Sequence, residues 1–207
     1  MEGEGKIRLA IIYYSATGTI HALATHAKVV AEADGAEVRL RLVKELAPPE
    51  AIAANPRWQA FYEAHRDDPK AEPEDLVWAD AMLFGLPARY GNMPAQMKEF
   101  IDSLGPVWSK GLLADKPVSA FASTQNPHGG QESTLLSFYQ TVYHWGAVVV
   151  TPGYTHPDVY KAGGNPYGTT ANAGQVGDGE RAAIAHQTRR LLAYARALRT
   201  LRSRQET

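Results

Sequence analysis

Residues 9–20 of the chain read LAIIYYSATGTI, and this stretch decides the fold. The apolar run of residues 9–14 predicts a buried strand, which leads directly into a short turn and the start of a helix. The turn carries the hydroxyls of Ser15, Thr17 and Thr19 beside the backbone N–H groups of a helix N-terminus. Such a group of donors binds a phosphate dianion without any basic side chain.

The helix after the turn has support of its own. Apolar residues recur at the three- and four-residue spacing of one buried helical face, and Gly35 suits the helix C-terminus. Gly18 would let the backbone approach a ligand closely. The alternative is an ordinary strand-to-helix connection. The chain lacks the P-loop pattern with its lysine, so a P-loop ATP site is not supported. It also lacks Gly-x-Gly-x-x-Gly, so a Rossmann-type dinucleotide-binding site is not supported.

Strand and helix patterns alternate along the whole chain. Strands are expected at residues 7–14, 37–43, 81–85, 117–121 and 147–150, and helices also at 93–104, 132–144 and 180–202. This predicts one α/β domain over residues 1–207, with a five-stranded parallel sheet in the flavodoxin-like order 2-1-3-4-5 and helices on both faces. Residues 37–43 alternate in polarity and should form an edge strand. Ligands in such sheets lie beyond the strand carboxyl ends, where residues 15–20 fall.

Two connections, residues 45–79 and 151–179, are longer than ordinary loops. In the first, Asn55-Pro56 predicts a helix start, and the following Trp58, Phe61 and His65 share one face with Tyr62. That face packs either on its own domain or against another subunit. The second connection is rich in glycine and proline, and its tyrosines favour an ordered loop.

Composition narrows the possible functions. The formal net charge of −1 creates no strong electrostatic field that would attract nucleic acid or an anionic membrane surface. Without cysteine the chain cannot use thiols, and redox chemistry needs a bound cofactor. A polar start and the lack of a long apolar run predict a cytoplasmic protein with neither signal peptide nor integral membrane segment. No metal site is expected, because His21 and His26 are five residues apart and His-Glu-x-x-His is absent.

Two further loops should meet the turn at the same sheet edge. They read LPARYGNMP at residues 86–94 and STQNPHGGQ at residues 123–131. Together the three loops suit FMN, a flat ring system with a phosphate tail. Taken singly, Tyr90 could be a packing aromatic and Arg89 a surface ion-pair partner.

Several motifs resemble the WrbA family of FMN-dependent NAD(P)H:quinone oxidoreductases. They are Ile-Tyr-Tyr-Ser-x-x-Gly-x-Ile at residues 12–20, Pro-x-Arg-Tyr-Gly-Asn-Met at 87–93, a helix with Met97, Phe100 and Asp102, Gly-Gly-Gln-Glu at 129–132, and GGNPYGTT at 163–170. The resemblance implies a flavodoxin-like fold, a homotetramer, and two-electron transfer from NADH or NADPH to quinones in a ping-pong cycle.

The resemblance also implies residue roles. FMN would be bound by Ser15, Ala16, Thr17, Gly18, Thr19, Ile20, Ala88, Arg89, Tyr90, Ser123, Thr124, Gln125, Asn126, Pro127, His128, Gly129 and His144. His144 would be catalytic, and Trp108 and Thr17 would contact the quinone and nicotinamide substrates. Without the resemblance, a buried structural histidine is the better interpretation of His144. For Trp108, packing in the core is then as good an interpretation as contact with a substrate.

This sequence departs from the family pattern at two places. Thr17 stands where the family commonly has an aromatic that contacts nicotinamide, and Gln125-Asn126-Pro127-His128 replaces a Thr-Gly-rich run. Thr17 makes the turn more like that of an electron-carrying flavodoxin. Two alternatives therefore stay open: an FMN electron carrier serving a protein partner, for which the charge of −1 is unusually weak, and a module without FMN that mediates assembly.

Overall fold

The computed structural model describes residues 5–205, and side chains up to residue 199. Its sheet runs in the order β2-β1-β3-β4-β5, with every pair parallel, so the predicted flavodoxin-like topology is confirmed. The strands are β1 (Arg8–Tyr13), β2 (Glu37–Leu42), β3 (Ala81–Pro87), β4 (Pro117–Thr124) and the short β5 (Val148–Val149). A strand that the sequence did not indicate, β6 (Thr170–Asn172), pairs with the carboxyl end of β4.

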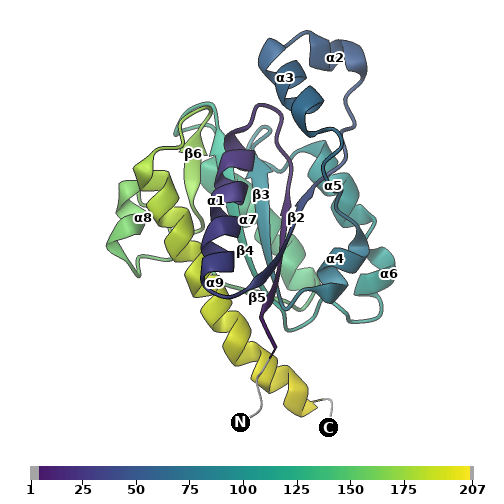
Figure 1. Cartoon of the computed structure of the whole chain (residues 1–207), viewed down its shortest axis with the longest axis vertical. Coiled ribbons are helices and arrows are strands. Elements are labelled where there is room, and N and C mark those ends of the chain that lie inside the picture. Colours follow the sequence, from purple (N-terminus) through teal and green to yellow (C-terminus); the bar gives the residue numbers. More distant parts are fainter. Residues whose placement is uncertain (1–4, 206–207) are drawn as a thin grey trace.

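Helices cover both faces of this sheet (Figure 1). On one face, α1 (Thr19–Ala33) and the long α9 (Asp178–Gln205) lie side by side. The other face is covered by α4 (Pro73–Trp78), α5 (Ala95–Asp102) and α7 (Gln131–His144), with α6 (Gly105–Trp108) after α5. The predicted helices thus form, with ends shifted by a few residues. Among the described residues, no helix is both long and apolar enough to cross a membrane.

The alternation of side chains along β1 divides the core into two layers. Ile11 and Tyr13 pack under α1 and α9, whereas Ile12 and Tyr14 pack toward α4, α5 and α7. Strand β2 is at the sheet edge, as predicted. Its Arg39 donates to the nearly buried Asp75 of α4 over 3.1 Å, so the polar residues of the edge strand anchor a helix.

The segment between β2 and β3 contains helices that lie outside the layers that cover the sheet. Helices α2 (Pro49–Ala53) and α3 (Pro56–His65) project beyond the body of the molecule in Figure 1. The predicted start of α3 is confirmed, because Asn55 Oδ1 accepts from the N–H groups of Arg57 and Trp58 at 3.1 and 3.3 Å. No residue of α3 is fully buried.

The segment from residue 151 to residue 179 contains α8 (Pro157–Lys161) and β6. Gly168 lets β6 approach β4, because a Cβ there would lie 2.1 Å from the carbonyl oxygen of Ala120. Only glycine fits this contact.

Candidate functional site

The turn between β1 and α1 has the predicted form. Gly18 has φ of 94° and precedes α1 without a side chain that could cap the helix. Its N–H donates to Ser15 Oγ at 3.1 Å, and Thr19 Oγ1 accepts from the N–H of Gly174 at 2.8 Å. The turn therefore brings hydroxyls and the positive end of the α1 dipole to one place, which favours an anion.

The two other predicted loops join this turn. The N–H of Tyr14 donates to the carbonyl of Gly85 at 3.2 Å, and that of Ala88 to the carbonyl of Ser123 at 2.8 Å. The loops after β3 and β4 also touch, since a Cβ at Gly130 would lie 2.6 Å from Cα of Gly91. Three segments distant in sequence thus meet at the carboxyl edge of the sheet.

Tyr90 occupies the tip of a two-residue turn. Tyr90 and Gly91 have φ of 52° and 76°, and Arg89 and Asn92 exchange backbone hydrogen bonds of 2.8 and 3.0 Å across the turn. Two successive positive φ angles indicate a type I′ turn, which strains a tyrosine. The Tyr90 side chain is fully exposed, so it is not a packing aromatic within this chain.

A cavity of about 230 Å³ opens where the loops meet. It is lined by Ser15, Ala16, Thr17, Thr19, Ile20, Asn55, Trp58, Pro87, Ala88, Arg89, Ser123, Thr124, Gln125 and Ala173. The sequence missed four of these: Asn55, Trp58, Pro87 and Ala173. Pro87 directly precedes a predicted residue, whereas Asn55 and Trp58 come from the projecting α2–α3 segment.

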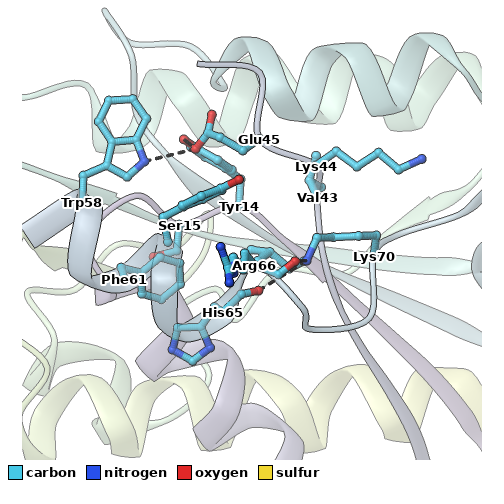
Figure 2. A pocket seen from close by; sticks show the side chains of 12 residues that line it. Tyr14, Ser15, Val43, Lys44, Glu45, Trp58, Phe61, His65, Arg66 and Lys70 are labelled. Carbon is cyan, nitrogen blue, oxygen red and sulfur yellow. Dashed lines mark hydrogen bonds between the residues drawn. The ribbon is translucent and has the colours of Figure 1, made fainter. Parts of the chain in front are cut away.

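Beside this cavity lies a second pocket of about 290 Å³, drawn in Figure 2. The two share Ser15 and Trp58 as lining residues. At its edge the Glu45 carboxylate accepts hydrogen bonds from the Tyr14 hydroxyl at 2.7 Å and Trp58 Nε1 at 3.1 Å. Gln96 Nε2 donates to the same carboxylate at 2.7 Å.

These contacts shift the pKa values of the Glu45 carboxyl and the Tyr14 phenol. Burial would raise the pKa of Glu45, but hydrogen bonds from Ala47, Tyr14, Gln96 and Leu46 outweigh it and lower the pKa. Burial, with the adjacent Glu45 carboxylate, raises the pKa of the Tyr14 phenol. Glu45 is therefore an ionised acceptor at neutral pH, and it holds α3 to the end of β1.

Part of the loop after β4 faces elsewhere. Asn126 Oδ1 accepts from the N–H of His128 at 3.0 Å, which closes a local turn directly after the last lining residue of this loop, Gln125. Pro127 and His128 instead line a separate hollow of about 670 Å³ beside residues 161–165. Asn126 and Gly129 line neither the cavity nor this hollow.

His144 and Trp108 lie together, but far from the turn. Trp108 Nε1 donates to the carbonyl of His144 at 2.8 Å, and both residues line a shallow hollow on α6 and the end of α7. The N–H of Asp115 donates to the carbonyl of Gly146 at 3.0 Å, so this end of α7 is at the amino end of β4. The length of β4, roughly 25 Å at 3.3 Å per residue, separates it from the cavity.

Both side chains are exposed: His144 is on the surface, and Trp108 keeps 50% of its area accessible. Neither a buried structural role for His144 nor a core role for Trp108 fits this exposure.

The sheet order and the hydroxyl-rich turn at the start of α1 define a flavodoxin-like α/β protein. The chain belongs to the NADPH-dependent FMN reductase family, whose family model matches residues 7–158. It is 50% identical over 186 residues to an "NAD(P)H dehydrogenase (quinone)" of Deinococcus radiodurans, covering 89% of this chain and 93% of that protein. A protein of the same name from Aromatoleum aromaticum is 45% identical over 186 residues, with coverage of 84% and 86%.

Solved structures agree on the fold. A WrbA-like flavodoxin from Agrobacterium tumefaciens superposes with a TM-score of 0.67 at 19% identity, covering 93% of this chain and 99% of that one. Flavodoxin 1 from Bacillus cereus gives a TM-score of 0.58 at 14% identity, with coverage of 90% and 97%.

Proposed function

We propose that the chain is an FMN-dependent NAD(P)H:quinone oxidoreductase of the WrbA type. The observation that carries the proposal is the cavity at the carboxyl edge of the sheet, where a hydroxyl-rich turn, a strained aromatic turn and the loop after β4 meet. The family and the activity named for the Deinococcus radiodurans relative support it.

The residues of the turn fit the phosphate of FMN. Ser15 and Thr19 are nearly buried hydroxyls, while Thr17 is exposed at the mouth. The uncapped first turn of α1 adds N–H donors and a favourable dipole for a dianion. Gly18 has a positive φ that is strained for residues with a Cβ, so glycine allows the backbone conformation of this turn.

The other two loops suit the ring system. Ala88 and Arg89 form one side of the cavity, and Ser123, Thr124 and Gln125 form another. Their backbone groups can bond the polar edge of a flat ring. Tyr90 does not line the cavity, but its exposed side chain at the turn tip can cover the face of a ring that protrudes from it. Asn126, Pro127, His128 and Gly129 contribute to FMN binding only through a rearranged loop, because they do not line the cavity.

Bound FMN would supply the redox chemistry, accepting a hydride from NADH or NADPH and passing two electrons to a quinone. The protein binds and orients the reactants. Thr17, exposed at the mouth, would contact the nicotinamide, and its short side chain leaves room for a flat substrate.

We further propose that His144 and Trp108 act at the cavity of a second copy of the chain. Within one chain they lie at the opposite edge of the sheet from Ser15, yet both are exposed, and Trp108 offers a flat apolar surface for a quinone. The imidazole of His144 could donate a proton to a quinone oxygen, because histidine is the side chain that most often serves as a general acid or base. This arrangement needs an oligomer, for which we propose the homotetramer.

Anaerobic stopped flow tests the activity. The FMN-loaded protein is mixed first with NADH or NADPH and then with benzoquinone. Fast loss of the visible flavin absorbance followed by fast recovery is expected of a quinone reductase. Slow reduction by both nicotinamides, with FMN still bound, would refute the proposal and indicate an electron carrier with a protein donor. A protein that binds no FMN would leave only an assembly role.

A further inference from the structure

Two histidines and an aspartate converge outside the proposed flavin cavity. His21 is in the first turn of α1, His65 ends α3, and Asp68 follows in the connection to α4. One possible ligand atom of each residue lies within 4.8 Å of the others. Figure 2 shows the imidazole of His65 beside Phe61, and their ring centroids are 4.4 Å apart.

We propose that His21, His65 and Asp68 form a binding site for one divalent transition-metal ion of the zinc class. Two imidazole nitrogens and a carboxylate oxygen are a ligand set that Zn²⁺ accepts, with water completing a tetrahedron. Tetrahedral ligands at about 2.0–2.2 Å from the metal lie roughly 3.4 Å apart. The three side chains are all half-buried, so small rotations can close the remaining gap.

A neighbouring hydroxyl already orients the imidazole of His21. The Tyr13 hydroxyl lies 2.8 Å from Nδ1 of His21, which leaves Nε2 of that ring for a metal. Nε2 lies 3.4 Å from Thr25 Oγ1, which is a long and weak contact. A partner on the second ring nitrogen is the usual support of a metal-bound histidine, because it fixes the tautomer and the ring orientation.

The imidazole of His65 lies against the two other proposed ligands. Nδ1 of His65 is 2.9 Å from Asp68 Oδ2, and the His21 and His65 ring centroids are 4.2 Å apart. The two rings are tilted by 45°, so their edges can face a common point. A surface ion pair between His65 and Asp68 alone would not require His21 to be there.

The metal would fasten α3 to α1. No residue of α3 is fully buried, so the hydrophobic core holds this helix weakly. Phe61 of α3 also lies over the turn, because a Cβ at Gly18 would be 3.7 Å from its ring. A metal bridge from His21 to His65 and Asp68 would therefore fix the helix that supplies Trp58 to the cavity wall.

Calorimetric titration of the tag-free, chelator-treated chain with Zn²⁺ tests the site, in FMN-free and FMN-loaded protein alike, so the result does not depend on redox activity. One ion per chain is expected. H21A, H65A and D68N should each weaken binding by at least about 100-fold, since losing a ligand costs no less than losing a supporting group. D68N keeps the side-chain shape, which guards against loss of the fold.

His186 provides the matched control. It stacks on His156 with ring centroids 4.8 Å apart, so H186A removes a half-buried histidine from a second histidine pair, formed by α9 and the start of α8. This variant should bind Zn²⁺ as the parent does. Y13F should weaken binding by about 10-fold through His21. Unchanged binding in H65A and D68N, binding lost in H186A, or no binding at micromolar Zn²⁺ would each overturn the site.

Two further readouts check geometry and effect. Co²⁺ should give the intense visible bands of a tetrahedral site in the parent and lose them in D68N; weak octahedral bands would contradict the ligand set. Zn²⁺ should slow amide hydrogen exchange in α3 of the parent and not of H65A. Metal binding without protection of α3 would refute the bridge between α1 and α3.

Discussion

Replacing Glu45 by glutamine tests whether α3 is held to the sheet by one carboxylate. Oε2 of Glu45 accepts from the Tyr14 hydroxyl and Trp58 Nε1, and Oε1 accepts from Gln96 Nε2 and from the N–H groups of Leu46 and Ala47. All five partners donate. A glutamine amide offers a single acceptor oxygen, so its NH₂ group must face donors on one side or the other.

The cost follows from this mismatch. With the amide oxygen toward Leu46 and Ala47, the Tyr14 hydroxyl can turn to accept from the NH₂ group, but Trp58 Nε1 loses its partner. Hydrogen bonds to a charged group contribute about 1.5–3 kcal/mol each. In E45Q the bond from Trp58 Nε1 is lost, and the remaining hydrogen bonds are made to a neutral group instead of a carboxylate. Because Glu45 is partly exposed, solvent reduces the resulting loss of stability. We expect E45Q to lower the free energy of unfolding by about 2 kcal/mol.

Urea denaturation at pH 7, followed by circular dichroism, measures this change. The control is E50Q, which replaces an exposed glutamate on α2 of the same segment and should stay within about 0.5 kcal/mol of the parent. Hydrogen exchange should also show faster opening of α3 in E45Q. If E45Q and E50Q were equally stable and exchanged alike, the carboxylate would not be the anchor of α3.

The pH dependence supplies an independent check. Because the pKa of Glu45 in the folded protein is below its ordinary value of 4.5, ionised Glu45 stabilises the folded state fully above that value. The contribution is lost as pH falls through the lower, folded-state pKa. The stability difference between the parent and E45Q should therefore shrink as pH falls below about 4.5. A difference that grows on acidification would contradict the assignment.

Three further variants test other parts of the molecule. S15D should reduce FMN affinity about a thousandfold, since two like charges about 4 Å apart repel by about 4 kcal/mol at an effective dielectric constant of 20; unchanged flavin content on gel filtration would refute the phosphate site. G168A should cost about 3 kcal/mol in urea denaturation, because its Cβ would meet the Ala120 carbonyl, and a smaller loss than 1 kcal/mol would mean that β6 can move. H144A should slow quinone reduction in stopped flow while FMN affinity stays the same, and a loss of FMN instead would give His144 a binding role.

The sequence was informative where the structure is local. Strand β1, the turn at Gly18 and helix α1 are contiguous in the chain, so one hydrophobic pattern and one glycine predict them together. The gathering of the loops near Ala88 and Ser123 followed from topology alone, because parallel strands end at one edge. Strand β6 was missed because its three residues, TAN, carry no hydrophobic pattern.

Contacts between distant residues could not be predicted. Trp58 was recognised as part of an aromatic helix, but its place in the cavity wall depends on Glu45, with which it shares no sequence pattern. The same holds for His21 and His65, which meet across 44 positions, whereas spacing along one helix compared only His21 with His26. Sequence spacing detects ligand pairs within an element and is blind to pairs that tertiary folding creates.

The wall of the cavity that Asn55 and Trp58 form is held by fewer buried contacts than its other walls. The turn and the loops after β3 and β4 follow strands whose carboxyl ends are buried, whereas Asn55 and Trp58 belong to the N-cap and first turn of α3, a helix without a buried residue. Segments held by few buried apolar contacts open at a fraction of the global unfolding free energy. Opening of α3 would widen the cavity without disturbing the sheet, so a ligand enclosed there can exchange while the fold stays intact. The hydrogen bonds of the Glu45 carboxylate, those of Lys70 Nζ to the carbonyls of His65 and Arg66, and the proposed metal site would all oppose this opening.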